Sequence, residues 1–274
     1  MMGYKRQKRI GAVLGVILGT GLAVLFNLVP GTRQAVGAFF AQPPYLLAGL
    51  LVVVLIIFLP RYRRSAQLST EADRLLSEGH VVAALEKYEA ARSLARSKAI
   101  PTYNIGISRL QLWQLDAAER ELMSLEERDD LQPWFRKVLY SALALVAALD
   151  GRLWQAVQRL DEAKVVPGDT PVMATLASAV IACRTGKEAE ARTQLERPEV
   201  QKLEGPLRGL REAMLAWCQE RLTGERRFVE AIFVFGEASP DKLQAGWPEL
   251  VAFLLERSRR EQEEPAQGAR CVPS

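Results

Sequence analysis

The feature that most constrains this chain is an apolar run of twenty residues near its N-terminus, from Ile10 to Val29. Only Thr20 and Asn27 within this run are polar. At about 1.5 Å of rise per residue, a helix of this length crosses the hydrocarbon core of a bilayer, which is about 30 Å thick. The run is also longer than the apolar core of a signal peptide, which has about 7–15 residues. It therefore predicts a retained membrane-spanning helix over residues 10–29.

A second apolar run, from Tyr45 to Leu59, consists almost entirely of Leu, Val and Ile. Pro43 and Pro44 precede it and suit the first turn of a helix. The backbone N–H that proline lacks would have no partner within the helix at that place. The run predicts a second span over residues 44–60, so residues 1–64 are expected to form a transmembrane hairpin. The alternative is a buried helix of a soluble domain.

The charged residues are distributed unevenly between this hairpin and the rest of the chain. The chain has 36 Lys and Arg against 32 Asp and Glu, but residues 1–64 hold eight basic residues and no acidic one. The loop 30–44 between the spans holds only Arg33. Because basic residues favour the cytoplasmic side of a membrane, the pattern predicts a two-span protein of a bacterial inner membrane, with both termini and the rest of the chain cytoplasmic. Topology thus explains the positive charge, and binding to nucleic acid is not predicted.

Three glycines in the first run, Gly11, Gly15 and Gly19, follow one another at four-residue spacing. They share one face of a helix, where a second backbone can approach closely. The spacing predicts a transmembrane packing seam, either against the second span or against another chain in an oligomer or a hetero-complex. The alternative is that glycine is simply frequent in membrane helices.

From residue 65 onward, apolar residues recur every three or four positions, which predicts helices. The segment from Gly79 to Ala91 has a glycine, a small residue five positions later (Ala84), a large one at Tyr88 and a small one at Ala91. The same spacing recurs three times, with some positions changed: Trp113, Ala118, Leu122, Leu125; Gly151, Ala156, Leu160, Ala163; and Gly186, Ala191, Leu195, Pro198. In the helices that precede these units, the matching small positions are Ala72, Gly106, Ala144 and Ala179. Small residues at these places allow two antiparallel helices to cross at close range.

This pattern resembles the tetratricopeptide-repeat family, in which a glycine closes the first helix of each pair. The resemblance implies an all-α chain whose transmembrane hairpin is followed by a solenoid of helical hairpins over residues 65–200. A degenerate repeat and a capping helix are expected over 201–262, with the cap from Asp241 to Arg260, and a disordered tail over 263–274. Trp113, in place of the turn glycine, is a departure from the pattern.

The resemblance also implies a concave groove, lined by the first helix of each pair, that binds an extended peptide or a helix of a partner protein. The predicted groove residues are Tyr103, Asn104, Ile107, Gln111, Ser141, Leu145, Ala148, Leu176, Val180 and Arg184. Asn104 falls where peptide-binding members of the family hold a main chain or a terminal carboxylate, but the basic companions of that clamp are missing. Asn104 as a simple surface amide is the alternative.

The helix from Tyr140 to Leu149 is apolar all round, which implies burial on every side. Its groove face is therefore expected to be covered, either by a partner segment or by the chain's own C-terminal helix.

Residue patterns for catalysis, metals or cofactors are missing from the sequence. The single histidine, His80, lies in a predicted turn, and no metal-binding spacing of Cys and His occurs. Cys183, Cys218 and Cys271 are widely spaced along the chain and are expected to be reduced thiols. We therefore expect no catalytic residues, no metal and no cofactor.

These observations predict a non-enzymatic scaffold or adaptor that is anchored in the membrane and presents a cytoplasmic groove to another protein. The alternative is an assembly or regulatory subunit of a larger membrane complex, which it contacts through the transmembrane hairpin. The layout is similar to that of HemY-like two-span membrane proteins, in architecture only.

Overall fold

The computed structural model describes residues 45–225 and 234–256. All regular secondary structure within these ranges is helical, which confirms the all-α class. The chain divides into two compact units, residues 1–60 and residues 61–274. The predicted first span, with Gly11, Gly15 and Gly19, and the predicted tail over 263–274 lie outside the described residues.

The second apolar run forms the beginning of helix α3, Tyr45–Ser77, which continues through Pro60 into the first repeat. It is therefore not a separate helix that ends at residue 60, as the sequence had predicted. Within the described ranges, no helix combines the length and the apolar character that crossing a membrane requires. The transmembrane hairpin stays a prediction from the sequence.

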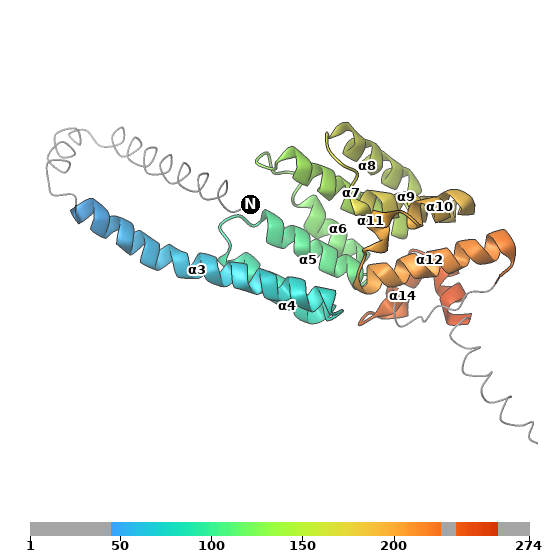
Figure 1. Ribbon diagram of the computed structural model, residues 1–274, viewed down its shortest axis with the longest axis horizontal. Coiled ribbons are helices and arrows are strands. Elements are labelled where there is room, and N and C mark those ends of the chain that lie inside the picture. The colour runs from blue at the N-terminus through green and yellow to red at the C-terminus, as the bar shows by residue number, and fades with distance from the viewer. Residues whose placement is uncertain (1–44, 226–233, 257–274) are drawn as a thin grey trace, which may run out of the picture. The chain divides into compact units, whose positions relative to one another are not determined.

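The second unit is built from successive helical hairpins that pack against one another (Figure 1). The last part of α3 pairs with α4, α5 pairs with α6, α7 with α8, and α9 with α10. Their bounds are α4 Val81–Leu94, α5 Ala99–Gln111, α6 Leu115–Met123, α7 Pro133–Leu149, α8 Leu153–Val165, α9 Val172–Arg184 and α10 Glu188–Leu195. The remaining helices are α11 Pro198–Gln201, α12 Gly205–Thr223, α14 Pro240–Gln244 and a helix over 248–256.

The first helix of each hairpin ends in the same type of turn. Its left-handed residue is Gly79 (φ 88°), Trp113 (φ 56°), Gly151 (φ 86°) or Gly186 (φ 72°), the four positions that the sequence pattern aligned. In each turn the N–H of this residue and the N–H of the next donate to carbonyls three and five positions back. These two hydrogen bonds end the helix and reverse the chain within three residues.

Trp113 is the one non-glycine residue with positive φ in the described part of the chain. A left-handed conformation costs an L-residue about 1–2 kcal/mol. Burial offsets this cost, because the indole is only 1% exposed and its Nε1 donates to the carbonyl oxygen of Val234 at 3.0 Å. A large side chain is tolerated in this turn because the indole binds a segment that lies 121 residues further along the chain.

The two helices of each hairpin meet at small residues that are completely buried. Ala84, Ala118, Ala156 and Ala191, near the start of each second helix, are all 0% exposed. The closest approach is at Gly106 in α5, where a Cβ atom would lie 2.8 Å from Cγ and Cδ2 of Leu122 in α6. Contact at this distance leaves no room for a larger residue.

Ion pairs join several neighbouring helical elements of the array. Arg92 bonds to Glu121 at 2.8 Å, Arg152 to Glu119 at 2.7 Å, Arg159 to Glu126 at 2.5 Å, and Arg221 to Glu188 at 3.5 Å. Most of these side chains are partly buried, so the pairs are less screened than pairs on open surface. They link the first hairpin to the second, the second to the third, and the fourth to α12.

The C-terminal part of the chain departs from the single capping helix expected over 241–260. Helix α14 ends at Gln244, and a second helix begins at residue 248. Gly246 lies between them so close to the end of α7 that a Cβ atom there would collide with the carbonyl oxygen of Leu149. Pro248 then occupies the first turn of the following helix, which removes a backbone donor from any continuous helix.

We expect Gly106→Val to lower the free energy of unfolding by about 1–3 kcal/mol, because the new side chain overpacks the contact with Leu122. Thermal or urea unfolding measures the change. Ile100→Val, at a 57% exposed position of the same helix, is the control and should change stability by less than about 0.5 kcal/mol. Combining Gly106→Val with Leu122→Ala should cost less than the sum of the two single changes; a fully additive result would contradict this contact.

Candidate partner-binding surface

The predicted groove residues are covered by the chain itself. Seven of the ten are buried and three are partly buried, so none is exposed. The buried ones are Ile107, Gln111, Ser141, Leu145, Ala148, Leu176 and Val180, and the partly buried ones are Tyr103, Asn104 and Arg184. Their role in binding a partner stays a prediction, but in this conformation they do not form an open groove.

The groove residues of α5 contact neighbouring helices of the same chain. Tyr103 packs edge-on against Phe135 of α7, with the ring centroids 5.5 Å apart, and burial raises the pKa of Tyr103. The backbone carbonyl of Asn104 accepts a hydrogen bond from Ser108 Oγ at 2.9 Å. Gln111 is 6% exposed and its Oε1 lies 3.3 Å from the position that a Cβ of Gly205 would take. The first turn of α12 therefore lies against the end of α5.

The groove residues of α7 and α9 belong to one continuous apolar core. Every residue of α7 from Ser141 to Leu149 is buried, as the all-round apolar sequence predicted. Leu145, Leu176 and Val180 are 0% exposed and share their cluster with C-terminal residues such as Trp247. The chain's own residues bury this helix, so no partner segment is needed to cover it.

Arg184 holds the C-terminal segment against the hairpins. Its Nη1 donates to the carbonyl oxygen of Gly246 at 2.8 Å and to that of Leu149 at 3.3 Å. Its guanidinium lies 5.2 Å from the ring centroid of Trp247, and burial lowers its pKa. Arg184 therefore satisfies the last carbonyls of α7 and binds the turn between α14 and the following helix.

Residues 234–247 contact the turn end of every hairpin. Glu237 accepts a hydrogen bond from the backbone N–H of Val82 in the first hairpin at 2.6 Å, and Val234 accepts from Trp113 in the second. Gly246 contacts the end of α7 in the third hairpin and Arg184 in the fourth. We call residues 234–247 the C-terminal strap.

The second helix of the third hairpin, α8, has large apolar side chains on its outer face. Trp154 is 80% exposed, Val157 43% and Val165 84%. With Gln158, Asp161 and Glu162 they line an open hollow of about 430 Å³. We call these six residues the α8 outer face.

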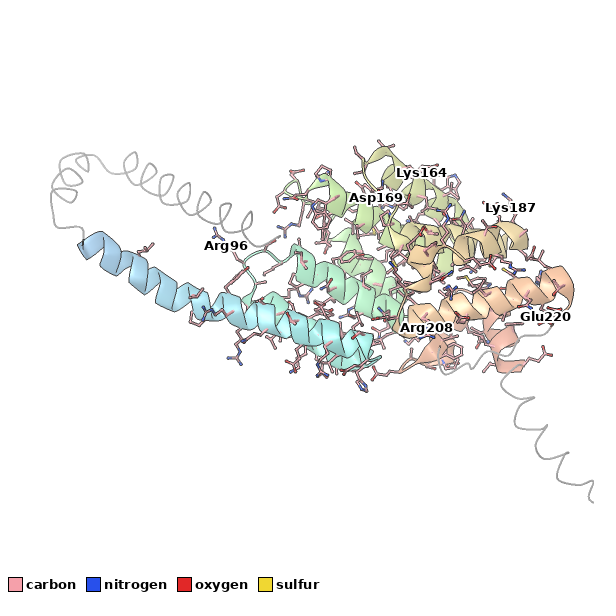
Figure 2. All side chains as sticks on the ribbon, in the orientation of Figure 1. Arg96, Lys164, Asp169, Lys187, Arg208 and Glu220 are labelled. Carbon is pink, nitrogen blue, oxygen red and sulfur yellow. The ribbon has the colours of Figure 1, made fainter. Side chains whose placement is uncertain are left out.

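The α8 outer face points away from the core. The opposite face of α8 carries Ala156, Leu160 and Ala163, which are buried, while Arg152 and Arg159 bind residues of α6 and of the segment that follows it. Figure 2 shows Lys164 on α8 and Lys187 just before α10, both toward the outside of the second unit. This face could have been found in the sequence. Trp154, Val157 and Val165 lie on the side of the helix opposite the small and apolar residues that the repeat pattern assigns to the core.

We expect Arg184→Gln to loosen the C-terminal strap, because the carbonyls of Leu149 and Gly246 lose their shared donor and Trp247 loses its cationic neighbour. Hydrogen exchange followed by mass spectrometry should show that the substitution speeds up exchange in residues 240–256 more than it does in α5 or α6. Arg192→Gln removes a half-exposed arginine that bonds within its own segment to Glu196, and it should leave the strap protected. Equal exchange of the strap in both variants would show that Arg184 does not anchor it.

No family model, no curated protein and no solved structure matches the chain. The tetratricopeptide resemblance therefore rests on the residue spacing in the sequence.

Proposed function

We propose that the protein is a non-enzymatic, membrane-anchored scaffold that binds another protein through its array of helical hairpins. The observation that carries this proposal is the α8 outer face, where Trp154 and Val165 are both at least 80% exposed. Large apolar side chains that gather on one face of a helix and stay exposed among the described residues are typical of protein-binding surfaces. Tryptophan is also among the residues that contribute most to binding energy at such surfaces.

The α8 outer face is better suited to this role than the first-helix groove. Most of the predicted groove residues are buried in the core, and the C-terminal strap covers the turn ends of the same helices. Opening the groove would expose Trp247, Leu243 and Leu250, which are at most 2% exposed. At about 25 cal/mol for each Å² of apolar surface returned to water, such an opening would cost several kcal/mol.

The occupant that fits the α8 outer face is an amphipathic helix of another protein. The apolar residues lie at positions 154, 157 and 165, so they follow one side of the helix for about three turns, or roughly 16 Å. Two helices pack along such a stripe through residues at three- and four-residue spacing. Asp161 lies among them and already pairs with Lys164 of the same helix at 2.8 Å, so the apolar side chains carry the match to the facing helix.

The membrane anchor and the family membership of this proposal are supported by the sequence. The two apolar runs, the basic residues that flank them and the almost neutral loop favour a two-span hairpin in a bacterial inner membrane, with the helical array in the cytoplasm. The four aligned turn residues favour a tetratricopeptide-like solenoid. A second candidate function, a subunit that contacts a larger membrane complex through the hairpin, is favoured by the spacing of Gly11, Gly15 and Gly19.

We expect a photo-reactive amino acid at position 154 or 165 of the full-length protein to cross-link, in native membranes, to a helix of a partner protein. Peptide mapping of the cross-linked species identifies the contacting segment, which should be amphipathic. Position 100 is the matched control, because Ile100 is an exposed apolar residue of α5 outside the α8 outer face. Trp154→Ser with Val165→Ser should abolish co-purification of the same partner, whereas Ile100→Ser should retain it.

Two results would overturn parts of the proposal separately. If positions 154 and 165 give no more cross-links than position 100, the α8 outer face does not bind a partner. If cross-links instead come from positions 11, 15 and 19, the second candidate function is correct. Digestion of α5 to α10 by a protease added to intact spheroplasts would contradict the cytoplasmic placement of the repeats.

A further inference from the structure

Two cysteines that are widely separated in the sequence meet in the core of the second unit. Cys183 in α9 and Cys218 in α12 are 35 residues apart, and their Sγ atoms lie 3.5 Å from each other. Cys183 is 4% exposed and Cys218 is 0% exposed, and both are free thiols. The sequence predicted reduced thiols that are widely spaced along the chain, and the packing of α9 against α12 brings two of them into a hydrogen-bonded pair.

The surroundings of the pair make the two thiols unequal. The hydrogen bond with Cys183 lowers the pKa of Cys218 and outweighs burial and the negative charge of Glu188, which raise it; Arg192 and Arg221 add a smaller lowering effect. The same hydrogen bond and burial raise the pKa of Cys183. Arg221 is held near Cys218 because its guanidinium lies 4.4 Å from the ring centroid of Trp217 and its Nη1 lies 3.5 Å from Glu188. The direction of these pKa shifts favours Cys218 as the thiolate, which is the reactive form of cysteine.

We propose that Cys183 and Cys218 are an oxidation site at which a peroxide converts the dithiol into a reversible intramolecular disulfide. The two sulfur atoms are already in contact, and they need to approach by about 1.5 Å to reach the bond length of about 2.05 Å. A peroxide is the oxidant that suits this pair, because a small molecule reaches buried thiols more readily than a bulky disulfide does.

The reaction proceeds in two balanced steps. The Cys218 thiolate attacks one oxygen of hydrogen peroxide, the O–O bond breaks, and Cys218 becomes a sulfenic acid while hydroxide leaves and takes up a proton to form water. The Cys183 sulfur then attacks the Cys218 sulfur, the S–O bond breaks, and the proton of Cys183 leaves with the hydroxyl group as a second water. The two thiols have together lost two electrons, which reduce the peroxide.

The disulfide would connect the fourth hairpin covalently to the C-terminal region. Helix α9 carries Arg184, which anchors the C-terminal strap, and α12 leads toward the strap along the chain. Cross-linking two residues restricts the unfolded chain, so the oxidised protein should be more stable than the reduced one. This inference does not depend on the proposed scaffold function, because neither cysteine belongs to the α8 outer face.

The experiment uses the full-length protein with Cys271→Ser, so that only the two paired cysteines remain. After treatment with hydrogen peroxide, digestion without reduction should yield a peptide pair joined through Cys183 and Cys218, which dithiothreitol separates. The midpoint of thermal unfolding should rise on oxidation and return to its starting value on reduction. The Cys271→Ser protein, called the parent protein below, tests disulfide formation without any change to Cys183 or Cys218.

Two further variants test the order of the steps. With Cys183→Ser, peroxide should stop at a sulfenic acid on Cys218 that dimedone traps. With Cys218→Ser, Cys183 should remain a thiol at the same dose. The proposal is overturned if the parent protein accumulates sulfinic acid at either cysteine without the joined peptides, or if Cys183 is the first to be oxidised.

Discussion

The close contact between the two helices of each hairpin is the constraint on which the rest of the structure depends. The helices meet at residues without a long side chain, namely four fully buried alanines and Gly106, whose neighbour Leu122 fills the space that a Cβ would need. Successive hairpins then pack side by side, and Arg–Glu pairs form between the first and the second and between the second and the third. If one hairpin were wider, these contacts with the next hairpin would be displaced as well.

A simple helical array has contacts only between neighbouring units, but the C-terminal strap adds contacts over much longer distances in the sequence. It bonds to residues that precede it by 155, 121 and 62 positions, in the first, second and fourth hairpins. A segment that touches every hairpin stabilises their relative positions together rather than pair by pair. This accounts for Trp113, which replaces the turn glycine of the other hairpins, and for Arg184, because each binds the strap.

The same contacts decide which surface remains for a partner. The strap and the first turn of α12 lie against the ends of the first helices, so the residues that would line a peptide groove are part of the core. Apolar side chains that the core does not use are found on the α8 outer face. Binding there and oxidation of the Cys183–Cys218 pair concern different helices, so either can occur without the other.

The sequence by itself determined the all-α class, the positions of the four hairpin turns and the small residues at which the helices meet. These features are local: a left-handed turn and a three- or four-residue apolar period depend on residues close together in the chain. Even the exception was visible, because Trp113 stands at the position where the other three units have glycine. The sequence also suggested that the helix from Tyr140 to Leu149 is buried on all sides, because no polar face remains on it.

Only the tertiary structure decided what buries that helix, which role Arg184 has and which cysteines meet. Each of these depends on the angle and distance at which successive hairpins stack, and that geometry brings together residues between 35 and 155 positions apart. No local period records such a contact. The sequence could therefore place the groove residues on one face of the first helices, but it could not show that the chain's own C-terminal residues occupy the space beside them.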